Sequence, residues 1–339
     1  MAHFITTPAP HVHSGDSVRR NMLLVILALM PAYVVSVLEF GIGALITAAV
    51  SVAACVLIEW LISRFLLKES GKSIGDLSAA LTGLLLAFNL PSSIDWWIVV
   101  LGALFAIGAG KMSFGGLGQN PFNPALVGRV FLLISFPQQM TTWPVANGFE
   151  TSYVDAQTGA TPLYYLKHLI GLSNGSEAVD TANALPSLWD SLMGAMGGSL
   201  GEVCALALII GGIFLIAMRV ITWHIPVAII ATVALFAACV SWFGGVPNEA
   251  ISTGSFVAYE LLTGGLMLGA FFMATDYVTS PMTAWGKIIF GVGIGVIMMV
   301  IRLLGNYPEG MSFAILIMNA CVPLLNKIRP QHFGEPKKA

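Results

Sequence analysis

Charge is scarce in this chain, and that scarcity decides its class. Asp, Glu, Lys and Arg make up only 9% of the 339 residues, while 57% are hydrophobic. An average soluble domain carries roughly 25% charged residues. No block of Lys and Arg interleaves with aromatic residues, so nothing indicates nucleic-acid binding. The apolar residues form long runs, which predicts an all-α polytopic membrane protein in contact with a lipid bilayer.

Cysteine is equally scarce, with only four residues in the chain. Each lies inside an apolar run, far from the others and outside any C-x-x-C pair: Cys55, Cys204, Cys239 and Cys321. This spacing predicts buried free thiols, and neither an iron–sulfur cluster nor a metal site. A G-x-G-x-x-G unit after a strand is missing too, so no motif for NAD is present. We expect no catalytic residue in this chain alone.

The apolar runs divide into ten expected membrane spans, since each approaches the ~17 to 25 residues that cross a hydrocarbon core. The expected ranges are 22–38, 41–66, 77–91, 96–111, 122–137, 200–218, 225–243, 257–275, 286–303 and 311–326. Lys and Arg gather on the cytoplasmic side of membrane proteins. A cytoplasmic N-terminus satisfies this rule and makes the C-terminus cytoplasmic as well. It leaves the loop 138–199, with Lys167 alone, on the outer face.

The two halves of the chain resemble each other. Residues 81–86 (LTGLLL) match 262–267 (LTGGLM), and 117–121 (LGQNP) match 304–308 (LGNYP). A repeat of five helices must insert in opposite orientations, because five is odd, which predicts two inverted five-helix repeats. The alternative is chance similarity between apolar segments. The expected parts are a cytoplasmic segment 1–21, a first repeat 22–137, an outer periplasmic loop 138–199, a second repeat 200–326 and a cytoplasmic tail 327–339.

Two spans are expected to be short or interrupted. The first, 77–91, ends at Pro91, and the second break lies in 274–281 (ATDYVTSP). Irregular backbone at membrane depth has to line a cavity or be covered by protein, so a ligand or an ion would meet exposed backbone dipoles there. The alternative is an ordinary helix end with a proline stop.

The outer loop contains the most informative polar motif, residues 155–162 (DAQTGATP). Gly159 and Ala160 leave the backbone open to close approach, and Pro162 stiffens the residues after it. We therefore expect the hydroxyl of Thr161 to point outward, as at an attachment site. The alternative is a loop that contains an Asx or Ser/Thr turn.

Asp155, Thr158, Gly159, Ala160 and Thr161 match the pattern D-x-x-[ST]-G-A-[ST], the flavin-attachment motif of bacterial respiratory flavoproteins. Further stretches resemble the NqrB/RnfD family, and most closely the D subunits of the Rnf ion-translocating electron-transport complex: 115–125 (GGLGQNPFNPA), 223–226 (WHIP), 268–276 (LGAFFMATD) and 305–310 (GNYPEG). The related B subunit of the sodium-pumping NADH:quinone reductase has a longer N-terminal region. Tyr277 and Glu309 depart mildly from the family pattern, which often has Pro and Asp there.

The resemblance implies that Thr161 carries FMN through a phosphoester and that Asp155 is recognised by a separate flavin-transferring enzyme. It implies a subunit that relays electrons in a complex working between ferredoxin and NAD and moving Na⁺ or H⁺ across the bacterial inner membrane. Because this chain has no motif for NAD or for clusters, other Rnf-type subunits would bind them.

Asn120 and Asn123 flank Pro121 just before the fifth span, so both amides could face a polar ligand at a helix start. In the related quinone reductase subunit the equivalent pair is associated with non-covalent riboflavin. The alternative is that both residues cap the helix. Arg129, in the same helix, would snorkel to the cytoplasmic interface or bind such a ligand.

Asp276, Glu59 and Glu202 lie near the ends of spans, where an ionisable group is costly unless it is paired or wet. They are candidates for an ion or proton path, or ordinary interfacial residues. Two functions compete with electron transfer. The inverted repeat would also suit a stand-alone solute channel or transporter, and a scaffold subunit would only hold its neighbours.

Overall fold

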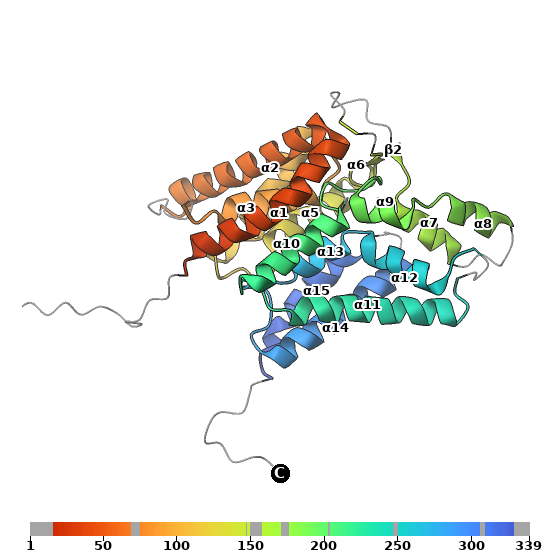
Figure 1. Cartoon of the computed structure of the whole chain (residues 1–339). Helices are drawn as coiled ribbons and strands as arrows, with labels where there is room; N and C mark the ends of the chain where they lie inside the picture. Colours follow the sequence, from red (N-terminus) through yellow and green to blue (C-terminus); the bar gives the residue numbers. More distant parts are fainter. Residues whose placement is uncertain are drawn as a thin grey trace, which may run out of the picture.

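The computed structural model describes residues 16–68, 75–146, 148–149, 158–170, 176–202, 204–246, 250–305 and 309–328. These residues are mostly helical (Figure 1). Strand is confined to β1 (Trp143–Pro144) and β2 (Thr158–Gly159) in this part of the chain, and the two pair antiparallel. The predicted all-α class is confirmed for the described residues.

The first half of the chain contains five helical segments. They are α1 (Val18–Phe40), α2 (Ile42–Leu61) continuing into the π-helix η1 (Ile62–Leu66), α3 (Ser78–Phe88), α4 (Trp96–Leu104) continuing through η3 (Phe105–Ala109) to η4 (Met112–Phe114), and α5 (Pro124–Ser135).

The second half again has five segments. They are α10 (Ala205–Ala217), α11 (His224–Trp242), α12 (Thr253–Leu262) followed by α13 (Leu266–Leu268) and η5 (Gly269–Met273), α14 (Ala284–Leu304) and α15 (Met311–Leu325).

Each of the ten expected spans contains a helical segment, but only some of these segments are long enough to cross a membrane. Five described helices have the necessary length and composition: Val18–Phe40, Ile42–Leu66, Trp96–Phe114, His224–Trp242 and Ala284–Leu304. A sixth would be the bent pair Thr253–Leu262 and Leu266–Met273. The other four, α3, α5, α10 and α15, have 11 to 15 residues. At 1.5 Å per residue they fall short of a core of about 30 Å.

The interruptions have local causes. Residues 89–95 form turns between α3 and α4, and residues 274–283 are non-helical between η5 and α14, so both expected breaks lie at the ends of helices, which is the alternative interpretation. The structure adds a third break that the sequence did not lead us to expect, between α12 and α13, where the chain bends by 58°. Gly264 (φ +76°) and Gly265 (φ +65°) make this bend in left-handed conformations that favour glycine.

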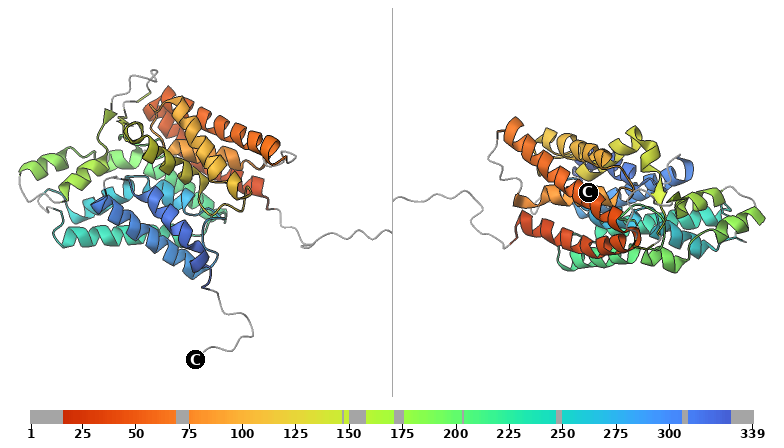
Figure 2. Two further views of the ribbon diagram at one scale, coloured as in Figure 1. Left: turned by 180° about the vertical axis from the view of Figure 1, so that it is seen from behind. Right: turned by 90° about the horizontal axis from the view of Figure 1, so that it is seen from above.

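The two halves pack against each other through corresponding elements. α1 contacts α10, and α5 contacts α15. In both side views the red-to-yellow helices lie on one side of the molecule and the cyan-to-blue helices on the other, with α10 beside α1 (Figures 1 and 2). A side chain at Gly211 of α10 would collide with the backbone of Ala28 in α1, so glycine permits this close approach.

The expected outer loop is not a bare loop. Its described part holds α6 (Pro137–Met140), the two strands, α7 (Pro162–Leu169), α8 (Ser176–Asn183) and α9 (Leu188–Met193). We call these elements the outer cap. α7 and α9 pack against α12. The Tyr259 hydroxyl of α12 donates a hydrogen bond to the Pro186 carbonyl (2.6 Å), and Lys167 of α7 donates to the Gly305 carbonyl. The cap is thereby fastened to the second half.

Candidate functional site

The described part of the predicted attachment motif begins in the small sheet of the outer cap. Thr158 lies opposite Pro144, and Gly159 opposite Trp143. A Cβ on Gly159 would lie 2.8 Å from a methyl group of Val145, so a larger residue here would require the Val145 side chain to shift. Asp155 lies outside the described residues. Thr161 lies two residues after Gly159, so the chain passes from the sheet to Thr161 with only Ala160 between them.

Thr161 stands at the N-cap of α7, with Pro162 as the first helical residue. The Tyr164 N–H donates to the Thr161 carbonyl (2.9 Å). Thr161 is only 4% exposed, whereas residues 158–160 are exposed. The expectation of an outward-pointing hydroxyl is therefore wrong for this structure. Pro162 starts a helix whose buried face, including Leu163 and Leu166, draws Thr161 beneath the surface.

The surroundings of Thr161 fit a phosphoester. The Thr161 side chain makes no capping bond to α7. The first N–H groups of a helix lack intrahelical partners and carry partial positive charge, which favours an anion at the N-cap. A phosphoryl group on the Thr161 hydroxyl would therefore meet favourable dipoles from α7.

A cavity of about 90 Å³ lies between the two halves on the predicted cytoplasmic side. Asn120, Asn123 and Asp276, three residues expected in functional sites, all line it. Lys111 is a fourth polar lining residue. Apolar walls come from Leu81, Leu85, Phe271 and Phe272. The fold thus brings residues more than 150 positions apart in the sequence to the walls of one cavity. We call it the interface cavity.

Asn123 acts as a helix cap. Its side-chain oxygen accepts from the Ala125 N–H (3.1 Å), and its amide nitrogen donates to the Met273 carbonyl (3.1 Å) at the end of η5. Asn120 donates to the Phe122 carbonyl (3.0 Å). The capping interpretation is confirmed for Asn123, and the same residue ties the two halves together.

Glu59 is fully buried and forms an ion pair with Lys111 (2.6 Å). Lys111 also donates to the Ser78 hydroxyl at the start of α3 (2.6 Å). Neither residue is therefore interfacial in this structure. Lys111 is only 1% exposed, because it lies within the segment Trp96–Phe114 and its side chain turns into the bundle toward Glu59.

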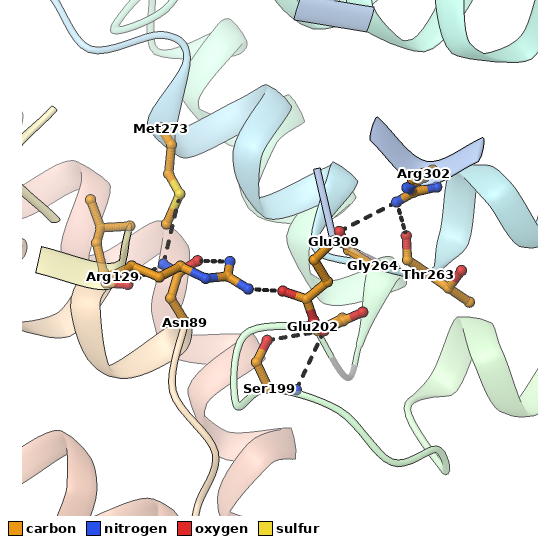
Figure 3. A network of polar contacts seen from close by, with 10 residues as sticks. Asn89, Arg129, Ser199, Glu202, Thr263, Gly264, Met273, Arg302 and Glu309 are labelled. Atoms are coloured by element: carbon orange, nitrogen blue, oxygen red, sulfur yellow. Dashed lines mark hydrogen bonds and ion pairs between the residues drawn. The ribbon is translucent and has the colours of Figure 1, made fainter. Parts of the chain in front are cut away.

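A buried polar network surrounds Arg129 (Figure 3). Arg129 is 5% exposed and pairs with Glu309, and it donates to the side-chain oxygen of Asn89 (2.5 Å). Snorkelling to the interface is therefore wrong: the side chain turns inward to a carboxylate that precedes α15. Glu202 also interacts electrostatically with Arg129, and it accepts a hydrogen bond from the Ser199 hydroxyl (3.1 Å).

A second buried arginine stabilises the unexpected break between α12 and α13. Arg302 of α14 pairs with Glu260 (2.5 Å) and donates to the carbonyls of Glu260 (2.7 Å) and Thr263 (2.9 Å). These carbonyls lie at the C-terminal end of α12 and have no N–H partner within the helix. Arg302 supplies the missing hydrogen-bond donors. Sequence reasoning missed Glu260, Arg302, Asn89 and Glu309 as site residues. A charge inside an apolar run was the available signal for Glu260 and Arg302.

A chain of polar contacts begins at Asp276 in the interface cavity. Asp276 accepts from the Thr279 hydroxyl (3.2 Å). Asn319 of α15, with its amide oriented to suit its neighbours, donates to the Thr279 carbonyl (3.0 Å) and accepts from the Asn123 N–H (3.2 Å).

The chain continues toward the predicted outer side. Asn123 bonds to the Met273 carbonyl, and the Met273 sulfur accepts from the Asn89 amide (3.7 Å). Asn89 in turn holds Arg129, which pairs with Glu309 (Figure 3). Polar groups from both halves thus link the interface cavity to the Arg129 network.

Comparison with known proteins agrees with this architecture. A model of the NQR2, RnfD, RnfE family matches residues 5–334. The chain is 43% identical to the D subunit of the proton-translocating ferredoxin:NAD⁺ oxidoreductase complex of Clostridium ljungdahlii, over 98% of this chain and 96% of the relative. It is also 43% identical to the D subunit of the Na⁺-translocating ferredoxin:NAD⁺ oxidoreductase complex of Acetobacterium woodii, over 94% and 91%.

A relative from Haemophilus influenzae, the D subunit of an ion-translocating oxidoreductase complex, is 38% identical over 99% of both chains. The apolar helices and this whole-chain similarity together identify a multi-pass membrane protein. The resemblance seen in the sequence is thereby confirmed, and this chain belongs to the NQR2, RnfD, RnfE family.

Proposed function

We propose that this chain is the membrane flavoprotein subunit of an ion-translocating ferredoxin:NAD⁺ oxidoreductase complex and holds FMN covalently on Thr161. The observation that carries the proposal is the attachment motif at the start of α7, within a chain 43% identical to D subunits of two such complexes. The other subunits of the complex supply the sites for NAD and ferredoxin, for which this chain has no motif.

Each part of the attachment region has a role in holding the flavin. When bound, FMN supplies one- and two-electron transfer. The Thr161 oxygen holds the phosphoryl group, and the N-terminus of α7 stabilises its charge. The pairing of Gly159 with Trp143 fixes the approach to Thr161. The contact of Lys167 with Gly305 keeps α7 close to the second half of the bundle.

Burial of Thr161 sets a condition on maturation. A flavin-transferring enzyme reaches the hydroxyl only when the segment around it opens or before α7 docks. The β1–β2 pairing covers two residues on each strand, and segments with so few ordered contacts open at low cost. Asp155 is proposed to be recognised by that enzyme.

The interface cavity is proposed to hold a second, non-covalent flavin of the riboflavin type. Aromatic and aliphatic walls with a few polar groups are typical of cofactor pockets. Phe271, Phe272 and Leu81 would contact the ring system, while Asn120 and Asn123 offer amide groups to its polar edge.

Two inverted five-helix repeats remain our proposal for the architecture. It is supported by the contacts of α1 with α10 and of α5 with α15, since symmetry-related elements meet across a two-fold axis. An ion path between the halves would use the polar chain from Asp276 to Arg129. Glu202 lies at its outer end, whereas Glu59 contributes through its pair with Lys111 beside the interface cavity. Both chain termini are proposed to be cytoplasmic, in a bacterial inner membrane.

A stand-alone solute channel or transporter is the second candidate. The bent pair α12–α13 favours it, because broken helices around a midplane site are typical of transporters. A transporter has no use for a covalent flavin, so flavin attachment separates the two functions.

The test is in-gel flavin fluorescence of the denatured polypeptide, expressed with a flavin-transferring enzyme. Thr161→Ala should abolish fluorescence, since it removes the oxygen that forms the phosphoester. Thr141→Ala, an exposed threonine of the outer cap, is the matched control and should stay fluorescent. A dark wild-type band beside a bright control flavoprotein from the same cells would favour the transporter.

A further inference from the structure

Seven charged side chains are buried in the described part of the chain: Glu59, Lys111, Arg129, Glu202, Glu260, Arg302 and Glu309. Four of them form two ion pairs in which one cation meets one carboxylate, Lys111 with Glu59 and Arg302 with Glu260. The remaining three are two carboxylates and one arginine. We call Arg129, Glu202 and Glu309 the charge triad.

The charge triad is assembled from three separate segments (Figure 3). Arg129 lies on α5, Glu309 precedes α15, and Glu202 precedes α10. Arg129 pairs with Glu309 and interacts with Glu202. Among the described residues, Glu202 has no ion pair of its own and is held by the Ser199 hydroxyl and N–H. Asn89 fixes the guanidinium from the side of α3 (2.5 Å).

The charges of the triad do not cancel. One guanidinium neutralises one carboxylate, and an additional buried carboxylate without a counter-charge is strongly unfavourable. The other buried charges of the described residues already neutralise each other in pairs, Arg302 with Glu260 and Lys111 with Glu59. One positive charge is therefore missing from this part of the protein interior.

A free ligand position accompanies the missing charge. Glu309 is 8% exposed, and its Oε1 atom has no hydrogen-bond partner in the part of the chain that the structure describes. Glu202 and Ser199 add oxygen atoms nearby. No group of three or more His, Cys, Asp or Glu side chains suited to a metal ion occurs among the described residues, so the position suits a single charge better than a divalent metal ion.

We propose that the charge triad binds one monovalent cation, either a proton or an alkali metal ion, on the predicted outer side of the bundle. Relatives at the same identity are named for protons and for Na⁺, so the experiment tests both cations. The inference rests on the proposed function, because it identifies a cation site of that ion-translocating subunit.

The experiment uses the full-length chain in lipid nanodiscs and follows its thermal unfolding midpoint. A ligand that binds the folded state raises the midpoint as its concentration rises. For Na⁺, the midpoint should rise when choline is exchanged for sodium at constant ionic strength. For a proton, the midpoint should rise as the pH falls and should not respond to sodium.

Glu202→Gln removes the excess negative charge and leaves the Arg129–Glu309 pair intact. It should fold and should lose the whole cation response of the wild type. Glu177→Gln, an exposed residue of α8, changes the net charge equally and should keep the response. A Glu202→Gln variant that retains the full response overturns the proposal.

Infrared difference spectra of the wild type decide the question even if the variant fails to fold. Proton binding gives a carboxylic-acid C=O band that disappears at high pH, and sodium binding shifts the carboxylate bands at constant pH. Absence of both signals overturns the proposal. Flavin fluorescence of the same preparation reports the proposed function separately, so a cation signal without flavin, or flavin without a cation signal, shows which proposal failed.

Discussion

At the scale of single residues, ion pairs hold the interior together. Lys111 and Glu59 are both almost completely buried, and Lys111 also reaches the Ser78 hydroxyl. Removing one partner of such a pair leaves an uncompensated charge, which costs far more than removing both. The pair joins Glu59 of α2 to Lys111, which lines the interface cavity. Loss of the pair should therefore disturb the cavity.

Lys111→Met should lower the free energy of unfolding by about 3–5 kcal/mol, because it removes the buried cation that pairs with Glu59. The double variant Lys111→Met with Glu59→Gln should recover most of this loss. Unfolding in mixed micelles measures both, and Lys327→Met, at an exposed lysine, is the control. Strictly additive single and double variants would show that the two side chains do not act as a pair.

At the scale of elements, the break between α12 and α13 connects the outer cap to the bundle. Gly264 has φ +76°, and a Cβ there would collide with Leu163 of α7 and with Arg302. Arg302 also binds the Thr263 carbonyl in the same turn (2.9 Å). A change at this turn should therefore displace α7, at whose N-terminus Thr161 lies.

Gly264→Ala should reduce the free energy of unfolding by about 1–3 kcal/mol, the usual cost of a side chain in a strained left-handed conformation. It should also change the extent of flavin attachment, read by in-gel fluorescence. Gly254→Ala is the matched control, since no atom lies within 4 Å of the added Cβ and its φ is ordinary. Its stability should be unchanged or raised by up to ~1 kcal/mol. Equal behaviour of both variants would contradict the proposed contact with α7.

At the scale of the whole molecule, two sites lie on opposite predicted faces. The attachment region belongs to the outer cap, and the interface cavity opens near the N-terminal end of α1. Polar groups from both halves lead from the interface cavity through Asn123 and Asn89 to the Arg129 network. This separation suits a subunit in which redox chemistry and cation movement influence each other across the bundle.

The orientation predicts which positions a membrane-impermeant maleimide can reach. In a variant without the four native cysteines, Glu177→Cys in α8 should react in intact spheroplasts. Arg219→Cys, just after α10 on the predicted cytoplasmic side, should react only after permeabilisation. Both side chains are exposed, so accessibility alone does not separate them. The reverse result would place Thr161 on the cytoplasmic face.

Local composition was enough to predict several features. The membrane class, the family and the approximate position of all ten helical segments follow from apolar runs, Gly and Pro positions and short motifs, which depend on neighbours in the chain. The lengths of the helices were harder to predict from the sequence. Runs such as 77–91 and 122–137 stay apolar beyond the ends of α3 and α5, so hydropathy predicted ten spans where five or six described helices have the required length.

The sequence by itself determined that this protein is a helical membrane protein of its family and that it has a match to the flavin-attachment motif. These properties depend only on composition and on the order of neighbouring residues. Only the tertiary structure decided that Thr161 is buried, that Lys111 pairs with Glu59, and that Arg129 turns inward to Glu309. These contacts join residues 52 and 180 positions apart for the two ion pairs. The physical reason is that the partner of a buried charge depends on how helices pack, which no local pattern specifies.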